Sequence, residues 1–463
     1  MDRMRIDRRR ALQLGAGGLL VGPAGMAFGQ PEPPTAKPGR GIARNVIVLV
    51  SDGMSTGTLT LAHLVRDIRG LGPSHWYRLW ERQDVRRAMC ETRSADGWVT
   101  DSAAAGSAWG IGVKVNNRSI NVTPDGATPE PILATAKSIG KATGLVTTTR
   151  LTHATPASFI ATVPHRVLEG AIATQMLERG VDIMLGGGAK HFPPALVNDE
   201  TDITVVRSSD ELTQASGGRG RLLGLFADDH MPFACDRPST TPSLQAMTRA
   251  ALDRLERSTE GFVLQVEAGR VDHAAHENDG IGLVADQIEF DDTIAVVEAW
   301  TRDRNDTLVI VTTDHANANP GLTYYGRRGV ESLEALARGT RSFEWIVQEA
   351  ARRGDGLEGL VASIAEATGV TLTDDEQGLL GRSWIERAPI NAFNIANGRG
   401  PALGSILANH TGVAFLSPNH TADAVELTAY GPGSERLPAL IDNTDVHRMM
   451  LAALDPRFEP AWR

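Results

Sequence analysis

Residues 262–276, with the sequence FVLQVEAGRVDHAAH, place acids and histidines directly after a short apolar run. The run Phe262–Val266 predicts a β-strand, because it is short, apolar and followed by a glycine-containing cluster. Glu267 stands where that strand ends. Asp272 and His276 are four residues apart, so on a helix both side chains share one face and can bind the same ion. The stretch therefore predicts a buried strand that leads into a metal-binding helix.

Other runs of this kind recur along the chain, and each ends in a polar or glycine-rich cluster. The further predicted strands are Asn45–Val50, Leu145–Thr149, Val181–Leu185 and Leu308–Thr312. Helical patterns separate them, including Thr58–Arg69, Pro131–Ile139, Val167–Arg179 and Ile281–Arg302. Continuous apolar strands that alternate with helices are typical of a parallel sheet covered on both faces. We therefore expect an α/β fold with a mostly parallel central sheet flanked by helices on both faces.

Acids and a histidine follow three of these strands. Asp52 follows the first strand, Glu267 follows Phe262–Val266, and Asp314 and His315 follow the last. The carboxyl ends of parallel strands meet at one edge of the sheet, where ligands bind. Carboxylate and imidazole together suit zinc, whereas oxygen ligands alone suit magnesium. One histidine near a strand end is usually structural, but two Asp/His pairs predict a metal centre.

The composition fits one large domain and argues against nucleic acid as the main partner. The chain has 463 residues, of which 41% are hydrophobic, enough to bury a large core. Its formal net charge is −10 at pH 7, and no long basic block follows the N-terminus. An anionic substrate must therefore be attracted locally, by metal ions or by a few arginines.

The N-terminal residues differ in composition from the rest. An arginine-rich start precedes an apolar, glycine-rich stretch, which predicts a signal peptide over residues 1–29. It resembles a twin-arginine export signal, and an ordinary secretory signal is the alternative. Residues 30–44 are rich in proline and predict a flexible leader before the folded domain, residues 45–463. The mature protein is thus expected to be periplasmic or secreted, with no stable membrane insertion.

A long segment, about residues 321–408, follows the last predicted strand. Helical periodicity runs through Glu331–Arg338, Phe343–Arg352 and Leu357–Ala367. We interpret the segment as an insertion that borders the site, either as its rim or as a subunit contact.

The chain has only two cysteines, Cys90 and Cys235. They do not form the close spacing of a metal-binding motif. In an oxidising compartment they could form one disulfide, and otherwise both would be small buried hydrophobic residues. The sequence leaves both alternatives open.

Ser102 lies in the segment Thr100–Ser107 (TDSAAAGS), where small helix-forming residues follow it. A serine at a helix N-terminus is close to backbone N–H groups and to the positive end of the helix dipole, which suits both an anion and a nucleophile. The alternative is that Ser102 or Asp101 is only an N-cap. Neighbouring chemistry must decide between these interpretations.

Five segments together closely resemble the alkaline phosphatase family, and they occur in the family's order. They are VLVSDGM at residues 48–54, TDSAAAGS at 100–107, THATPA at 152–157, QVEAGRVDHAAH at 265–276 and TDHA at 313–316. The resemblance extends from about Asn45 to about Asp455 and is weakest in the insertion. It implies an alkaline-phosphatase-like fold and a metal-dependent phosphomonoesterase.

The resemblance also implies two zinc sites that contain imidazole and one magnesium site made of oxygen ligands. The implied ligand sets are Asp272, His276 and His420 for one zinc; Asp52, Asp314 and His315 for the zinc beside the nucleophile Ser102; and Asp52, Thr155 and Glu267 for magnesium. This division agrees with the ligand preferences of the two metals.

Three further positions follow from the family pattern. Arg166 matches the arginine that holds phosphate, since a guanidinium binds two oxygens at once and stays charged at alkaline pH. His153 and His273 stand where some bacterial members have Asp and Lys and others have His at both. An imidazole there favours zinc or weakens magnesium, so the third metal stays open.

The last zinc ligand has two candidates. The tripeptides Asn409-His410-Thr411 and Asn419-His420-Thr421 both resemble the family's His-Thr signature. We choose His420 because a predicted strand, Ala424–Tyr430, follows it as in the family, and His410 remains the alternative.

The implied reaction is hydrolysis of small phosphate monoesters to an alcohol and inorganic phosphate through a phosphoserine. By analogy with the family, a homodimer is expected. The rival interpretations are a phosphodiesterase of the same superfamily and a non-catalytic phosphate- or zinc-binding protein. A sulfatase is disfavoured, because the Ser102 segment lacks the Cys/Ser-x-Pro-x-Arg pattern.

Overall fold

The computed structural model describes residues 43–194, 197, 202–455 and 457. The predicted signal peptide, residues 1–29, and the leader up to residue 42 lie outside the described residues. Ala43 is fully buried, and its N–H donates to the carbonyl of Ala453 at 2.7 Å. The described fold therefore already includes residue 43.

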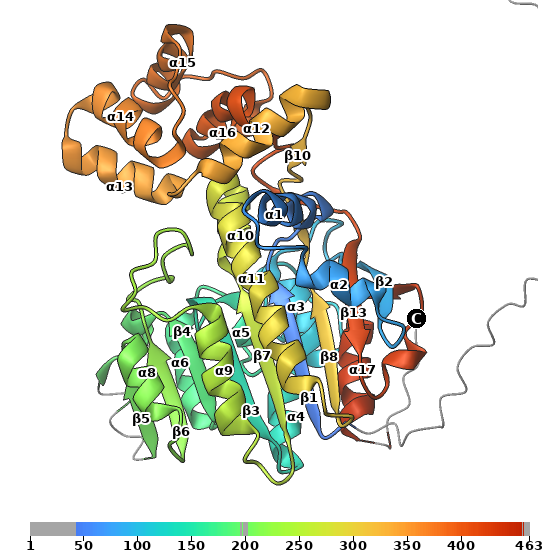
Figure 1. Cartoon of the computed structure of the whole chain (residues 1–463). Helices are drawn as coiled ribbons and strands as arrows, with labels where there is room; N and C mark the ends of the chain where they lie inside the picture. Colours follow the sequence, from blue (N-terminus) through green and yellow to red (C-terminus); the bar gives the residue numbers. More distant parts are fainter. Residues whose placement is uncertain (1–42, 195–196, 198–201, 456, 458–463) are drawn as a thin grey trace, which may run out of the picture. The chain divides into compact units, whose positions relative to one another are not determined.

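A ten-stranded sheet forms the centre of the described structure (Figure 1). Its strand order is β14-β2-β13-β8-β1-β7-β3-β4-β6-β5. Its pairings are parallel, except that β13 is antiparallel to both of its neighbours. The strands are β1 (Asn45–Ser51), β2 (Arg86–Glu91), β3 (Ala142–Arg150), β4 (Ile183–Gly187), β5 (Ile203–Val206), β6 (Arg221–Leu225), β7 (Phe262–Ala268), β8 (Thr307–Thr312), β13 (Val425–Tyr430) and β14 (Leu440–Asp442). The mostly parallel α/β sheet predicted from the sequence is confirmed.

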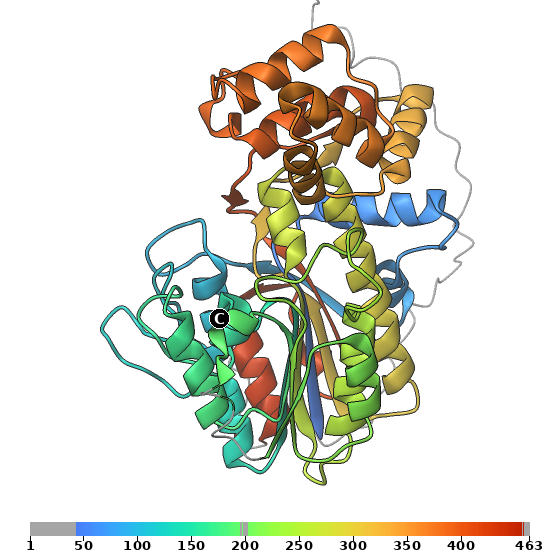
Figure 2. The same cartoon turned by 90° about the vertical axis from the view of Figure 1, so that its left-hand side faces the viewer.

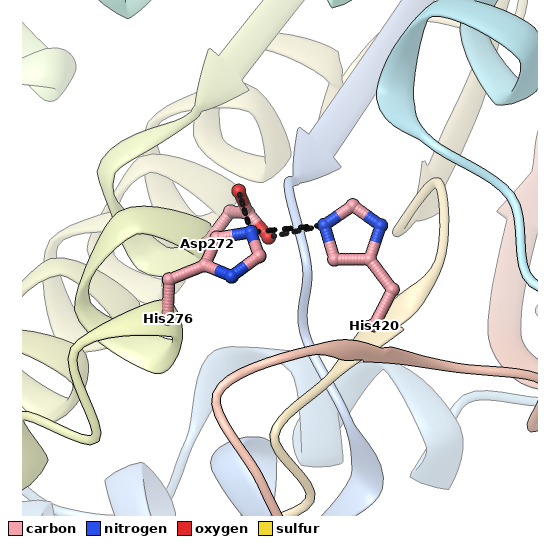
Figure 3. Close-up of side chains that lie close together, drawn as sticks. All are labelled: Asp272, His276 and His420. Atoms are coloured by element: carbon pink, nitrogen blue, oxygen red, sulfur yellow. Dashed lines mark hydrogen bonds and ion pairs between the residues drawn. The ribbon is translucent and has the colours of Figure 1, made fainter. Parts of the chain in front are cut away.

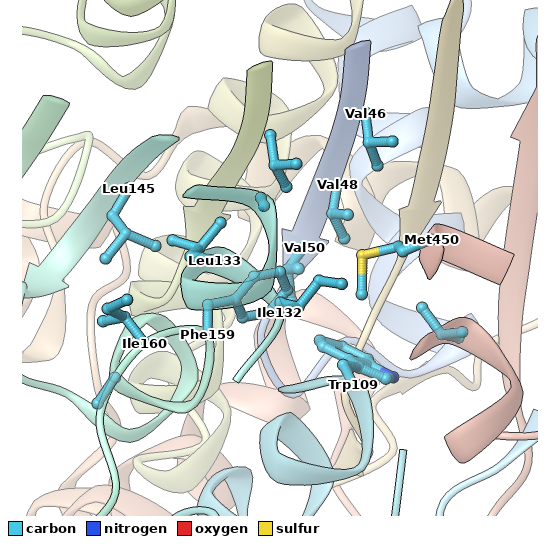
Figure 4. Close-up of a cluster of buried hydrophobic side chains, with 14 of the residues drawn as sticks. Val46, Val48, Val50, Trp109, Ile132, Leu133, Leu145, Phe159, Ile160 and Met450 are labelled. Atoms are coloured by element: carbon cyan, nitrogen blue, oxygen red, sulfur yellow. The ribbon is translucent and has the colours of Figure 1, made fainter. Parts of the chain in front are cut away.

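Helices cover both faces of the sheet (Figure 2). One face carries α3 (Ser102–Ile111), α4 (Ile132–Ser138), α6 (Glu169–Glu178) and α17 (Thr444–Leu454). The other carries α2 (His75–Glu81), α8 (Ser209–Ala215), α9 (Leu244–Leu255) and α11 (Gly280–Thr301). Alternate side chains of β1 enter the two cores: Val46, Val48 and Val50 enter the first (Figure 4), and Ile47 and Leu49 the second. This two-sided burial explains why β1 is apolar at nearly every position.

The predicted insertion folds into helices with an apolar core of their own. They are α12 (Gly326–Arg338), α13 (Phe343–Arg353), α14 (Gly356–Thr368), α15 (Asp374–Trp384) and α16 (Arg399–Thr411). The core is formed by α13 to α16. At its base, β10 (Gly321–Leu322) pairs with β11 (Val413–Ala414), so the chain leaves and re-enters the main domain at one place. A separate apolar cluster packs α12 against α1 (Thr56–Ile68) and α11.

Both cysteines are free. Cys90 is buried in β2, and Cys235 is partly buried against the second core. Of the two alternatives left by the sequence, the structure therefore has unpaired thiols. Within the described part of the chain, no helix has the length and apolar character needed to span a membrane.

Candidate active site

Three central strands bring their carboxyl ends together. Val50 of β1 lies beside Glu267 of β7 on one side and Thr312 of β8 on the other. Asp52 and Asp314 follow within two residues, and these two acids and Glu267 are all fully buried. Buried carboxylates at this density require positive charge nearby, because each loses its hydration.

Asp272, His276 and His420 form one compact group (Figure 3). The first two lie on α10 (Arg270–His276), one turn apart. His420 arrives from β12 (His420–Thr421), which pairs with β9 (Ala316–Asn317) directly after β8. The Asp272 carboxylate lies 3.3 Å from Nε2 of His276 and 3.4 Å from Nε2 of His420.

The geometry of the two imidazoles in this group fits a bound cation. Nδ1 of His276 lies 2.6 Å from the carbonyl of Pro418, and Nδ1 of His420 lies 2.8 Å from the carbonyl of Thr100. A carbonyl only accepts, so each Nδ1 carries a proton, and in the neutral form of each ring Nε2 then presents a lone pair. The two Nε2 atoms are 3.0 Å apart and cannot hydrogen-bond to each other in that state. A metal ion would satisfy both nitrogens and the carboxylate.

Without a metal, the charge of Asp272 dominates this group. Burial lowers the pKa of His276, but the Asp272 carboxylate outweighs burial and raises it to about 9. Burial conversely raises the pKa of Asp272, yet His276 and His420 hold it well below its usual range. Both shifts express the same attraction between a carboxylate and two imidazoles.

A second group surrounds His315. Its Nε2 lies 3.2 Å from Oδ2 of Asp314, 3.6 Å from Oδ1 of Asp52 and 3.3 Å from Oγ of Ser102. Those two carboxylate oxygens are buried and have no hydrogen-bond partner. Burial, reinforced by Asp272, raises the pKa of Asp314 to about 7. Unpartnered buried oxygens beside an imidazole are the atoms that a zinc ion would bind.

The carboxylate of Asp272 connects the two groups, because it also lies in a cluster with Asp52 and His315. In addition, Asn317 donates from Nδ2 to Oδ1 of Asp272 at 2.7 Å and holds that carboxylate in place. The sequence analysis did not single out Asn317; its position two residues after His315 was the available signal.

A third group consists of Asp52, Glu267, Thr155 and His153. The Thr155 hydroxyl donates to Oδ2 of Asp52 at 3.2 Å, and a cluster of ligand atoms joins Asp52, His153 and Glu267. Oε1 of Glu267 and Nδ1 of His153 are buried without a hydrogen-bond partner. An imidazole therefore does border the oxygen ligands expected to hold magnesium.

Ser102 is the first residue of α3, and its hydroxyl faces His315. The N-cap of this helix is Asp101, whose Oδ1 accepts from the N–H of Ala104 at 3.0 Å. Ser102 is thus not needed as the cap. Its hydroxyl lies at the positive end of the helix and beside the second group.

Arg166 contacts Asp101, the residue directly before Ser102. Its Nη1 donates to Oδ2 of Asp101 at 3.0 Å, and its Nη2 lies 2.9 Å from Nε2 of His153. The side chain is 22% exposed, so solvent or a ligand can still reach it. Asp101 therefore both caps α3 and orients the arginine next to Ser102.

The structure adds a histidine that the sequence analysis missed, His230. Its ring packs edge to face on those of His153 and His273, with centroids 5.6 and 4.3 Å away. Burial, followed by the charge of Arg150, lowers the pKa of His230 to about 3. No local motif marks His230, because its loop lies far along the chain from both partners.

The two candidate histidine tripeptides occupy different places. His410 lies on α16, and its Nε2 is 3.0 Å from a carboxylate oxygen of Glu376 within the insertion. His420 instead lies in the group with Asp272 and His276.

Comparisons with known proteins point to one family. A model of the family "Alkaline phosphatase" matches residues 43–455. The chain is 30% identical to alkaline phosphatase 4 of Bacillus subtilis, over 91% of each chain. It is 28% identical to streptomycin-6-phosphate phosphatase of Streptomyces griseus, over 98% of this chain and 99% of that protein. The crystal structure of Thermus thermophilus alkaline phosphatase has a TM-score of 0.82 at 35% identity, covering 89% of this chain and 91% of that one.

Proposed function

The chain belongs to the alkaline phosphatase family and is a phosphomonoester hydrolase, and we propose that Ser102 is its nucleophile within a three-metal site. The observation that carries this proposal is the position of the Ser102 hydroxyl. It lies at the N-terminus of α3, 3.3 Å from His315 and next to Arg166 and the buried carboxylates. Few structural roles require a hydroxyl among so many potential metal ligands.

The donor atoms of the three groups fit the metals implied by the family. Asp272, His276 and His420 would hold one zinc ion, and Asp52, Asp314 and His315 a second; Asp52, Thr155 and Glu267 would hold magnesium. When bound, the zinc ions supply positive charge that lowers the pKa of the Ser102 hydroxyl and neutralises the oxygen that departs. His153 borders this third site, and its imidazole adds a donor that suits zinc to a set of oxygen ligands.

The chain's own residues define the reaction. Oγ of Ser102 forms a bond to phosphorus while the ester P–O bond breaks, which releases the alcohol and leaves a phosphoserine. Water then attacks the phosphoserine, restores the serine hydroxyl and releases inorganic phosphate. Arg166 binds two phosphate oxygens with its guanidinium, and Asp101 holds that guanidinium in place at 3.0 Å. His153 lies 2.9 Å from the same guanidinium and fixes its other end.

Hydrolysis of a chromogenic phosphate monoester at alkaline pH tests this proposal. Wild type, Ser102→Ala and a control, Ser107→Ala, are each assayed after chelation and after addition of zinc and magnesium. Ser107 lies on the same helix, but its hydroxyl bonds the N–H of Asn121 at 2.9 Å. Wild type and the control should lose activity on chelation and regain it, while Ser102→Ala remains low. A metal-restored wild type without activity would leave the phosphodiesterase or binding interpretations.

The family and the composition also suggest the substrate class, the location and the oligomeric state. We propose that the substrates are small phosphate monoesters and that the mature protein acts in the periplasm or outside the cell as a homodimer. The arginine-rich start of the chain supports export by the twin-arginine route. Turnover of a phosphodiester, compared with that of a monoester, separates the main activity from a side activity.

A further inference from the structure

A cavity of about 890 Å³ opens beside the group of Asp272, His276 and His420. Its inner wall belongs to α10 and includes His273 and His276. Its outer wall comes from the insertion. That wall includes Phe343 and Val347 of α13, Trp384 at the end of α15, and Pro401 of α16. The insertion therefore helps to form a space that adjoins the metal-binding group.

Most of the surface that faces this cavity is apolar, although charged side chains also line it, and one arginine and one glutamate among them form an ion pair. Arg270 forms a close ion pair with Glu344, which ties α10 to α13. The same guanidinium covers the ring of Phe233, 3.8 Å from its centroid. Arg399 lies over the ring of Trp384 at 5.3 Å. A ligand here meets aromatic rings, two of which are covered by a guanidinium, an environment that favours flat apolar groups.

A series of side-chain contacts connects Ser102 to the cavity. Ser102 faces His315, whose ring stacks on that of His420 at a centroid distance of 3.6 Å. His420 in turn lies next to His276, with their Nε2 atoms 3.0 Å apart, and His276 lines the cavity. In phosphoryl transfer the leaving oxygen departs opposite the attacking oxygen. This series of contacts runs from the nucleophile to the cavity, and this is the direction that our proposal assigns to the leaving group.

We propose that this cavity binds the leaving group of the ester and gives the protein a preference for phosphate monoesters of bulky, ring-containing alcohols or phenols. The inference rests on the proposed function, because it takes Ser102 as the attacking group. The cavity volume lies within the range of about 300–1,000 Å³ typical of small-molecule sites, and a single benzene ring would leave most of it unfilled. Trp384 and Val347 are then specificity-determining residues of the insertion.

The test compares naphthyl phosphate with phenyl phosphate, whose leaving groups have similar acidity but different size. The kcat/KM of each ester is measured for metal-loaded wild type, Trp384→Ala, Val347→Asp and the control Tyr325→Ala. Tyr325 is an aromatic residue of the insertion that is 95% exposed and does not line the cavity. Wild type and the control should prefer naphthyl phosphate. The two cavity variants should lose that preference by roughly three- to tenfold, with inhibition by inorganic phosphate unchanged.

Each outcome separates this inference from the proposed function. Trp384 also packs against the core of the insertion, whereas Val347 is 42% exposed, so Val347→Asp keeps the test decisive where Trp384→Ala fails to fold. Activity on both esters with an unaltered preference in Val347→Asp overturns the cavity assignment alone. A metal-loaded wild type that hydrolyses neither ester overturns the proposed function and the cavity assignment together.

Discussion

Arg166 combines two contacts that leave it ready for an anion. Asp101 and His153 each bind one end of its guanidinium, at 3.0 and 2.9 Å, and neither neighbour encloses it. Such an arrangement holds a flexible side chain in one geometry before the ligand arrives, which reduces the entropy lost on binding.

Replacing Arg166 should therefore weaken phosphate binding strongly. For Arg166→Ala we expect kcat/KM on a monoester to fall by about one to two orders of magnitude, because charge-assisted hydrogen bonds to phosphate are lost. Arg166→Lys should be intermediate, since an ammonium cannot bind two oxygens in the same way. The control is Arg118→Gln, because Arg118 contacts Asp101 through its backbone N–H and its side chain is exposed. Equal activity of Arg166→Ala and the control would contradict the assigned role.

His420 and His410 offer a matched pair of substitutions at the residue scale. His420→Asn should lower the metal content by about one ion per chain, since it removes one of three ligands of one group. His410→Asn should keep the full metal content, because His410 bonds Glu376 within the insertion. Elemental analysis of the purified proteins measures both. Loss of metal from the His410 variant alone would reverse the assignment.

At the scale of elements, one aspartate joins a core helix to the insertion. Asp279 is the N-cap of α11, and its Oδ1 accepts from the N–H groups of Ile281 and Gly282, both at 3.0 Å. Its Oδ2 accepts from the N–H of Phe343, the first residue of α13, at 2.7 Å. Two backbone N–H groups of α11 and one of α13 therefore donate to the same buried carboxylate.

Asp279→Ala should destabilise the protein by about 2–3 kcal/mol, because it leaves three backbone donors without their acceptor. Ser243→Ala is the control: Ser243 caps α9 through a single hydrogen bond, to the N–H of Ala246 at 3.1 Å, and its loss should cost about 1 kcal/mol. Urea unfolding of both variants against wild type provides the measurement. Equal losses of stability would show that the contact with α13 contributes nothing.

Several strands were not predicted from the hydrophobic periodicity of the sequence. β2 has the sequence RRAMCE and alternates between buried and more exposed positions, and it pairs with the antiparallel β13 near one edge of the sheet. β5, β6 and β14 are short. The five strands predicted from apolar runs are all present, although β4 begins two residues later than the predicted Val181. Central strands carry a continuous apolar signal because both faces are buried, and edge strands do not.

At the scale of the whole molecule, four buried carboxylates lie close together at one end of the sheet: those of Asp52, Glu267, Asp272 and Asp314. Burial together with neighbouring acids raises the pKa of Asp52, and burial with Asp272 raises that of Asp314 to about 7. Between about pH 4 and 7, and without metal, these two carboxyls are still protonated in the folded protein. In the unfolded chain the same carboxyls have already lost their protons. The contribution of these two carboxyls to the stability of the metal-free protein therefore falls as pH rises through this range.

We expect metal removal to lower Tm and to make it depend on pH. The metal-free protein should melt at a lower temperature at about pH 8 than at about pH 6, while the metal-loaded protein changes less, because bound cations compensate the carboxylates. Differential scanning calorimetry at both pH values, with and without chelator, measures the effect. A metal-free protein that is equally stable at both pH values would show that the carboxylates do not govern its stability.

The sequence by itself predicted the central strands of the sheet and the acids and histidine that follow them. Apolar strand runs encode burial on two faces, and the acids and histidines that follow them are positioned by the strand ends, so local pattern was sufficient for Asp52, Glu267, Asp314 and His315. For the last ligand, the family resemblance favoured His420 and left His410 as the alternative, and the tertiary structure brings His420 to His276 through the pairing of β12 with β9. Only the tertiary structure showed that His230 lies beside His153. It also decided that the insertion closes a cavity beside the site. Such contacts join segments far apart in the chain, and they depend on the path of the backbone and on packing, for which no local pattern exists.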